Sequence, residues 1–200
     1  MSEDAAVAAL RAGLTVILPT DTVYGLCASA EGPEPTARLY ALKGREPSQP
    51  SALLAADVEL LFACVPELQG AAAAVVRALL PGPYTLVLPN PARRYPWLNG
   101  STPEAIGVRV PLLPAVTMRV LAAAGPVTAT SANLAGGPDP RSVDELAPEL
   151  RERVAAVVDA GLLPGTPSTV LDVSGSEPRL VREGAVPAAE ALARAREALA

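Results

Sequence analysis

Polar side chains that could bind a polyanion and a small polar molecule recur along the chain, each at or near the end of a predicted strand. They include four cations, several hydroxyl groups and one amide, namely Thr20 and Thr22, Lys43 and Arg45, Arg109, Ser131 and Asn133, Ser168, and Arg182. Phosphate oxygens favour the planar fork of arginine and the compact charge of lysine. Hydroxyl and amide groups suit a ribose, a carboxylate or an ammonium group. The set therefore predicts a site for a phosphorylated ligand beside a small polar one.

Several familiar chemistries are excluded by what the sequence lacks. The chain has no histidine, which removes Ser-His-Asp and Cys-His catalysis and histidine-ligated metals. A net charge of −5 argues against broad electrostatic binding of nucleic acid. Neither G-x-x-x-x-G-K-[ST] nor a G-x-G-x-x-G after the first strand occurs, and no carboxylate pair marks a glycosidase. An ATP site here must therefore have another design, and no protein-held metal is expected.

Length and apolar content predict one domain over residues 1–200. Half of the 200 residues are hydrophobic, which is enough for a core. No apolar run reaches the roughly 18 residues of a membrane helix. Glu3 and Asp4 stand where a signal peptide would be basic, and Cys27 and Cys64 form no disulfide framework. We expect a cytoplasmic protein with no membrane partner.

Predicted strands alternate with predicted helices, which favours an α/β fold around one twisted sheet. Strands are predicted over 14–18, 51–55, 84–88, 106–111, 127–130, 154–159, 169–172 and 179–182. Helices are predicted over 3–12, 36–42, 57–62, 70–80, 114–124, 142–150 and 187–199. Ligands of open α/β sheets bind beyond the carboxyl ends of the strands, where most of these polar residues fall.

The segment Pro19–Leu26 contains the first of these polar residues. Pro19 has no N–H to give to a sheet and is expected to end the first strand, and Gly25 is expected to permit a turn. Lys43 is the only lysine, beside fifteen arginines. A site that favours an ammonium over a guanidinium would explain this, although a coding bias that leaves one residual lysine is an alternative.

The segment Pro19–Leu26 resembles the opening signature of the YrdC/Sua5 family, the threonylcarbamoyl-AMP synthases. The similarity continues through further ordered blocks that cover nearly the whole chain: 42–45, 81–86, 108–111, 130–134, 168–172 and 181–184. The resemblance implies a single-domain, twisted, open, mixed sheet flanked by helices, with a concave cationic cavity. The additional C-terminal domain of the longer Sua5 form is expected to be absent.

The resemblance also implies a reaction in which L-threonine, bicarbonate or carbon dioxide, and ATP give threonylcarbamoyl-AMP and pyrophosphate, for modification of adenosine 37 in tRNA. It assigns the nucleotide to Lys43, Arg45, Gln49, Ser131 and Asn133, with Arg182 near the phosphates and Lys43 and Arg45 as catalytic residues. It assigns threonine to Thr22, Arg109 and Ser168, with Arg109 on the carboxylate. Mg²⁺ is expected with ATP, and a downstream threonylcarbamoyl transferase complex and weak tRNA contact are the further expected partners.

Two positions depart from the family pattern. Leu54 stands where several relatives have a histidine, and Asp139 stands where they often have a serine. Two alternatives therefore stay open beside the synthase. The first is a paralogue that keeps the fold but performs another nucleotide reaction, such as a hydrolysis, and the second is a non-catalytic RNA-binding or ribosome-assembly module.

Overall fold

The computed structural model describes residues 2–200, and within them one mixed sheet organises the fold. Its strands follow the order β7-β1-β2-β6-β3-β5-β4-β8-β9. Their bounds are β1 Val16–Pro19, β2 Tyr24–Ser29, β3 Ala52–Leu54, β4 Tyr84–Pro89, β5 Ala105–Arg109, β6 Val127–Ser131, β7 Ala156–Val157, β8 Thr169–Asp172 and β9 Arg179–Arg182. The pairs β1–β7, β3–β5 and β4–β8 are parallel, and the other neighbours are antiparallel. The predicted mixed α/β sheet is confirmed.

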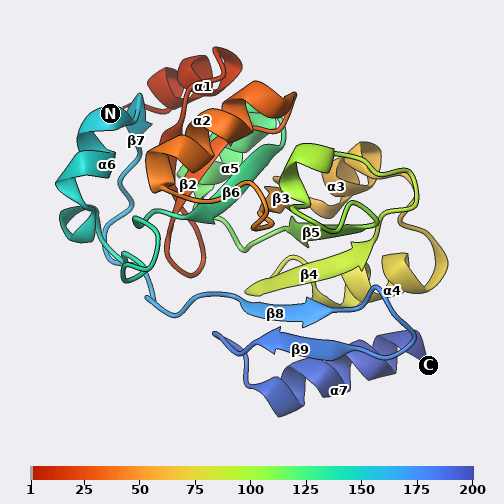
Figure 1. Cartoon of the computed structure of the whole chain (residues 1–200). Helices are drawn as coiled ribbons and strands as arrows, with labels where there is room; N and C mark the ends of the chain where they lie inside the picture. Colours follow the sequence, from red (N-terminus) through yellow and green to blue (C-terminus); the bar gives the residue numbers. More distant parts are fainter. Residues whose placement is uncertain (1) are drawn as a thin grey trace.

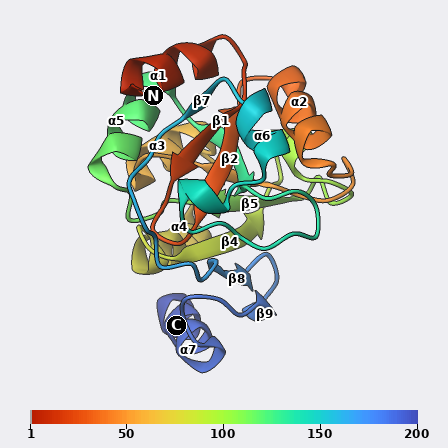
Figure 2. The ribbon, with the colours of Figure 1, turned by 90° about the vertical axis from the view of Figure 1, so that its left-hand side faces the viewer.

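Seven helices flank the sheet in the described residues. Their bounds are α1 Glu3–Arg11, α2 Pro33–Lys43, α3 Val58–Cys64, α4 Gly70–Leu79, α5 Ala115–Ala124, α6 Pro148–Arg153 and α7 Ala188–Leu199, with short 3₁₀ turns η1 Pro96–Leu98 and η2 Val143–Glu145. Figures 1 and 2 both place α1, α2 and α5 at one end of the molecule and α7 at the other. No helix in the described part of the chain is long and apolar enough to span a membrane.

The core consists of three apolar clusters that cover the two halves of the sheet differently. Around β1 and β2, alternate residues face opposite ways: Val16 packs with α1 and α5, whereas Ile17 packs with α2 and α6. Around β3, β4, β5 and β8, helices α3, α4 and α7 cover one face through residues such as Leu86 and Val108. Each fully buried leucine or valine contributes about 1.5–3 kcal/mol. The opposite face of these four strands is left for the cavity described below.

Two sequence expectations are wrong. Gly25 forms no turn, because it lies inside β2 and pairs with Leu18 and Ser131; the chain turns one step earlier, over residues 20–23. A glycine weakens the strand signal of β2, which explains the error. The helix expected over 142–150 is broken into η2 and α6, because Pro148 cannot continue a helix but can begin one.

Candidate functional site

A cavity of about 310 Å³ lies on the sheet face that α3, α4 and α7 leave uncovered. Small residues form much of its floor: Ala52 of β3 pairs with Ala129 of β6 on one side and with Gly107 of β5 on the other. The charged residues of its lining are Arg45, Arg109, Arg182 and Asp139. Three cations and one anion favour a phosphorylated ligand, and the expectation that the cavity as a whole is cationic stays a prediction.

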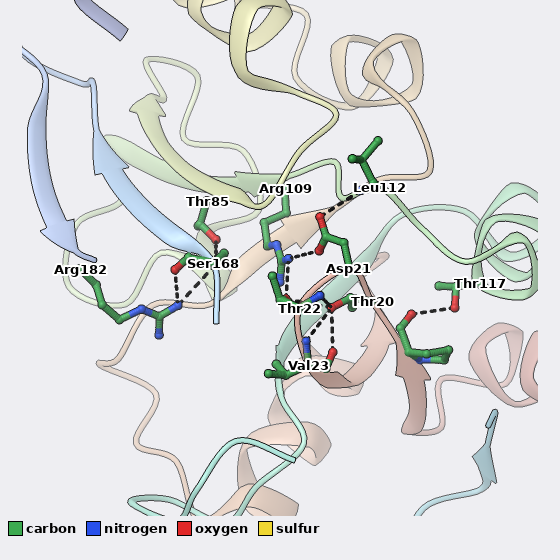
Figure 3. A network of polar contacts seen from close by, with 11 residues as sticks. Thr20, Asp21, Thr22, Val23, Thr85, Arg109, Leu112, Thr117, Ser168 and Arg182 are labelled. Carbon is green, nitrogen blue, oxygen red and sulfur yellow. Dashed lines mark hydrogen bonds and ion pairs between the residues drawn. The ribbon is translucent and has the colours of Figure 1, made fainter. Parts of the chain in front are cut away.

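Arg109, the last residue of β5, forms a buried ion pair. Its Nη2 donates to Asp21 Oδ1 at 2.9 Å and to Thr22 Oγ1 at 3.1 Å (Figure 3). The side chains of Arg109 and Asp21 are 12% and 9% exposed. The backbone N–H of Leu112 donates to the other Asp21 oxygen at 3.1 Å. The Asp21 carboxylate is thus held from two sides, and it in turn fixes one edge of the guanidinium.

Burial opposes both charges of this pair. It lowers the pKa of Arg109, against the pull of the Asp21 charge, and it raises the pKa of Asp21, against the pull of Arg109. The Arg109 Nε atom is buried without a hydrogen-bond partner, and Nη1 donates to nothing among residues 2–200. Arginine has five N–H donors, so this guanidinium still has N–H groups that can donate hydrogen bonds to a second carboxylate.

The turn over residues 20–23 delivers Thr22 to Arg109. The Thr20 hydroxyl donates to the Val23 carbonyl at 2.7 Å and accepts from the Thr22 and Val23 N–H groups at 3.2 and 3.3 Å. Because the Thr20 proton is used in this way, the Thr22 hydroxyl donates across the 3.0 Å contact between the two threonines. Its oxygen then accepts from Arg109. Thr22 is fully buried and is not among the residues that line the cavity, whereas Thr20 lines it.

Ser168 and Arg182 lie together on the β8–β9 side (Figure 3). The Ser168 hydroxyl is 2.8 Å from the Thr85 hydroxyl, and Arg182 Nη2 donates to the Ser168 carbonyl at 2.9 Å. A Cβ atom on Gly184 would overlap the Pro167 carbonyl oxygen, so only glycine allows this close approach. Ser168, Thr85 and Arg182 all line the cavity.

Lys43 ends α2, and Gly44 follows in the left-handed conformation with a φ of 69°. Lys43 is only 4% exposed. Its Nζ donates to the Ser131 and Asn133 carbonyls at 2.6 and 3.0 Å and to Asn133 Oδ1 at 2.5 Å, with a longer 3.4 Å contact to the Ser131 hydroxyl. Burial and the Arg45 charge lower the pKa of Lys43 to about 8, and Asp139 opposes them.

These contacts give Lys43 an internal role. Lys43 is not among the residues that line the cavity, whereas Ser131 is. The Ser131 hydroxyl donates to Asn133 Oδ1 at 2.7 Å, and Asn133 Nδ2 donates to the Gly137 carbonyl. The ammonium therefore holds the Ser131–Asn133 turn in place, and direct contact between Lys43 and a nucleotide stays a prediction.

Arg45 and Gln49 lie on the loop that follows α2. Arg45 lines the cavity, and its guanidinium donates to the Gln49 and Pro50 carbonyls and lies 6.0 Å from the Tyr40 ring centroid. Burial lowers the pKa of Arg45. The Gln49 side chain is exposed and is not part of the cavity lining. Its backbone carbonyl is the part of the residue that contacts Arg45. Leu54 lines the cavity and pairs with Arg109 across β3 and β5.

Sequence reasoning did not assign Asp21 or Thr85 to the site, although each contacts a residue that it did assign. Asp21 lies within the Pro19–Leu26 motif, but its partner Arg109 is 88 residues away. Thr85 is 83 residues from Ser168. Spacing along a chain cannot reveal such pairs, whereas an arginine inside the apolar strand 106–111 does signal that some partner is needed.

Comparisons with known proteins agree over most of the chain. A family model described as "Sua5_yciO_yrdC: Telomere recombination" matches residues 8–184. The threonylcarbamoyl-AMP synthase of Stenotrophomonas maltophilia is 37% identical over 170 residues, or 82% of this chain and 90% of that protein. A structure of Pyrococcus abyssi Sua5 complexed with L-threonine matches with a TM-score of 0.86 and 30% identity. That match covers 94% of this chain but 55% of the other, so this chain spans about half its length. Escherichia coli YciO matches with a TM-score of 0.83 and 26% identity, over 95% of this chain and 92% of that one.

Proposed function

The chain belongs to the Sua5/YciO/YrdC family, and we propose that it is a threonylcarbamoyl-AMP synthase. The reaction joins L-threonine, bicarbonate or carbon dioxide, and ATP into threonylcarbamoyl-AMP and releases pyrophosphate, which makes the enzyme a nucleotidyltransferase. Relatives that bear this name match most of the chain, and a related protein has been solved with L-threonine bound.

The observation that best supports this function is the environment of Arg109. A charged group in an apolar strand is costly unless it is paired, and Asp21 and Thr22 occupy only its Nη2 atom. Its Nη1 atom keeps donors from which an α-carboxylate can accept a charge-assisted hydrogen bond. The Ser168 and Thr85 hydroxyls line the same cavity and suit the hydroxyl and amino groups of threonine.

The nucleotide is assigned to the other end of the cavity, at Arg45 and Ser131, with Arg182 toward the phosphates. Lys43 and Asn133 support Ser131 there. Carbon dioxide first adds to the threonine amine to give N-carboxy-threonine. A carboxylate oxygen of that group attacks the α-phosphorus, and the bond from this phosphorus to the bridging oxygen breaks as pyrophosphate leaves. The residues must hold two anions in line and offset the developing charge, which needs no histidine.

ATP enters as its Mg²⁺ complex in this scheme. No group of three or more histidine, cysteine, aspartate or glutamate residues fit to hold a metal occurs among residues 2–200. The phosphates themselves are common ligands of Mg²⁺, often with one protein carboxylate. Asp139, the acidic residue of the lining, is the donor that fits. When bound, the ion neutralises phosphate charge.

We place the enzyme in the cytoplasm, where a downstream threonylcarbamoyl transferase complex consumes the adenylate to modify adenosine 37 of tRNA. The activated product is a mixed anhydride that water destroys, so its consumer must act soon after its release. Any direct contact of this chain with tRNA is expected to be weak, because the protein carries a net charge of −5.

Pyrophosphate release tests the reaction. With Mg²⁺ and ATP present, release should require threonine and bicarbonate together, because neither alone forms the nucleophile. The likeness to YciO keeps the paralogue with another nucleotide reaction as the second candidate. Equal release from ATP alone would identify that hydrolytic paralogue and reject the synthase. Nucleotide-independent RNA binding without pyrophosphate release would instead favour the RNA-binding module.

A further inference from the structure

Asp139 stands out in the cavity because its carboxylate has no hydrogen-bond or ion-pair partner among residues 2–200. It is the one acidic residue among the lining residues of the described chain. In the described part of the chain no hydrogen bond and no ion pair within 4.0 Å reaches it, and its charge acts on Lys43 only at longer range. The other carboxylate of this region, Asp21, is held by Arg109 and Leu112. An unpartnered anion in a site for a polyanion needs an explanation.

The backbone holds Asp139 firmly in this place. Pro138 and Pro140 flank it, which restricts Asp139 to extended conformations. The preceding Gly137 carbonyl accepts from Asn133 Nδ2, and the following Pro140 carbonyl accepts from the Tyr24 N–H at 2.9 Å. The backbone on either side of Asp139 is thus fixed to the Ser131–Asn133 turn and to the start of β2.

The negative charge of the Asp139 carboxylate determines which ligands it can favour. Beside the triphosphate of free ATP, it would repel the ligand. A divalent cation between the two anions reverses the sign of the interaction, and Mg²⁺ takes carboxylate and phosphate oxygens together. The Lys43 ammonium cannot take this place, because its protons already go to Ser131 and Asn133.

Building on the proposed function, we propose that Asp139 is a ligand of the Mg²⁺ ion that accompanies ATP, directly or through one of the waters of the ion. The carboxylate makes the cavity select MgATP and reject metal-free ATP. The family position that often carries serine then has a charged metal ligand in this chain, which makes nucleotide binding here depend on the ion.

Nucleotide binding with and without the ion tests this role. We would titrate the protein calorimetrically with α,β-methylene-ATP, whose α–β bridge cannot be cleaved, once in Mg²⁺ and once in EDTA. The variant Asp139→Asn should bind the Mg²⁺ complex about three- to fivefold more weakly and the metal-free nucleotide about three- to fivefold more tightly, the size of one partly exposed charge pair. The opposite signs distinguish a metal ligand from a general loss of structure.

The matched control is Asp144→Asn, which removes the same charge from an exposed position in η2, outside the lining. It should leave both affinities unchanged. Mn²⁺ in place of Mg²⁺ adds a spectroscopic readout, because the electron paramagnetic resonance spectrum of the ternary complex should differ between the wild type and Asp139→Asn. Thermal unfolding should be nearly the same in both proteins, since the carboxylate makes no hydrogen bond or ion pair within residues 2–200.

Each other outcome has a definite meaning. Equal weakening with and without the ion would make Asp139 a contact to the ribose and overturn the metal role, as would no change in either condition. If the wild type binds the nucleotide in neither condition, the proposed function itself fails.

Discussion

At one end of the cavity the Arg109 guanidinium is paired with the Asp21 carboxylate, whereas at the other end the Lys43 ammonium is surrounded by uncharged oxygens of Ser131 and Asn133. Both cations are largely buried. The ion pair keeps the arginine end close to neutral. At the lysine end no carboxylate of residues 2–200 forms an ion pair with the ammonium. Burial and the Arg45 charge lower the pKa of Lys43 to about 8, against the weaker effect of Asp139.

This difference separates two ways of placing a cation in a binding site. Arg109 has donors left over and can share its charge between Asp21 and a substrate carboxylate. Lys43 has none left over, so it acts through the turn that it holds. The first residue is expected to determine the use of threonine, and the second the use of the nucleotide. The variants below are designed to break this division.

The largest effect is expected from Lys43→Met. Loss of the ammonium frees the Ser131–Asn133 turn and removes charge-assisted bonds, so ATP use should fall on the order of 100-fold, or about 3 kcal/mol. The threonine requirement should change little. Steady-state kinetics with each substrate varied in turn measures both.

The variant Lys43→Arg keeps the charge at this position. It should still lose most turnover, because a planar guanidinium cannot reach the same set of oxygens as a compact ammonium. Wild-type turnover in Lys43→Arg would show that charge alone matters at this position.

Arg109→Ala should raise the threonine requirement by about 10- to 100-fold through the loss of a charge-assisted pair. It also leaves Asp21 buried without a partner, which should destabilise the fold by about 3 kcal/mol. The double variant Arg109→Ala/Asp21→Asn should regain much of that stability without regaining threonine use. If stability and threonine use return together, Arg109 is structural.

Alkaline pH should affect turnover and stability in opposite directions. As the pH rises through about 8, Lys43 loses the proton that holds the turn, and turnover should fall by about tenfold one pH unit above that value. In the unfolded chain the proton stays on Lys43 up to about the ordinary value of 10.5. The unfolding free energy should therefore rise with pH between these values, relative to Lys43→Met. A fall in both quantities would exclude Lys43 as the titrating group.

The smallest effect on activity is expected from Tyr24→Phe. The buried Tyr24 hydroxyl lies 2.9 Å from Asp159 Oδ1 and 2.8 Å from the Gly161 carbonyl, and it accepts from the Ala160 N–H. Its loss should lower the unfolding free energy by about 1–2 kcal/mol, as measured by denaturant titration. Kinetic constants for both substrates should stay within about twofold. A large rise in the threonine requirement would mean that this loop shapes the cavity.

Much of the fold could be predicted from local patterns. The strands β4, β8 and β9 coincide with the segments predicted as strands between glycine and proline residues. The Ser2 hydroxyl caps α1, as expected. The strand β2 could not be predicted, because Gly25 weakens its pattern and its pairing with β6 lies about a hundred residues away. The break at Pro148 could not be predicted either, because a proline can end one helix or begin the next.

The residues of the site could be predicted better than their contacts. Arg109 inside an apolar strand signals a partner, but its choice of Asp21 depends on the turn over residues 20–23. The resemblance predicts that Lys43 contacts a nucleotide, which stays a prediction, but its contacts with Ser131 and Asn133 could not be foreseen from the sequence. In both cases, packing between segments far apart in the sequence determines where the side chain points, and no local sequence pattern reveals it.

The synthase reaction itself is tested most directly by following the carbon of bicarbonate. The protein is incubated with ATP, Mg²⁺, L-threonine and ¹³C-labelled bicarbonate, and the products are resolved by mass spectrometry. We predict a threonylcarbamoyl adenylate that carries one labelled carbon and forms only when all the substrates are present. Release of pyrophosphate or phosphate without any labelled adenylate would contradict the assignment.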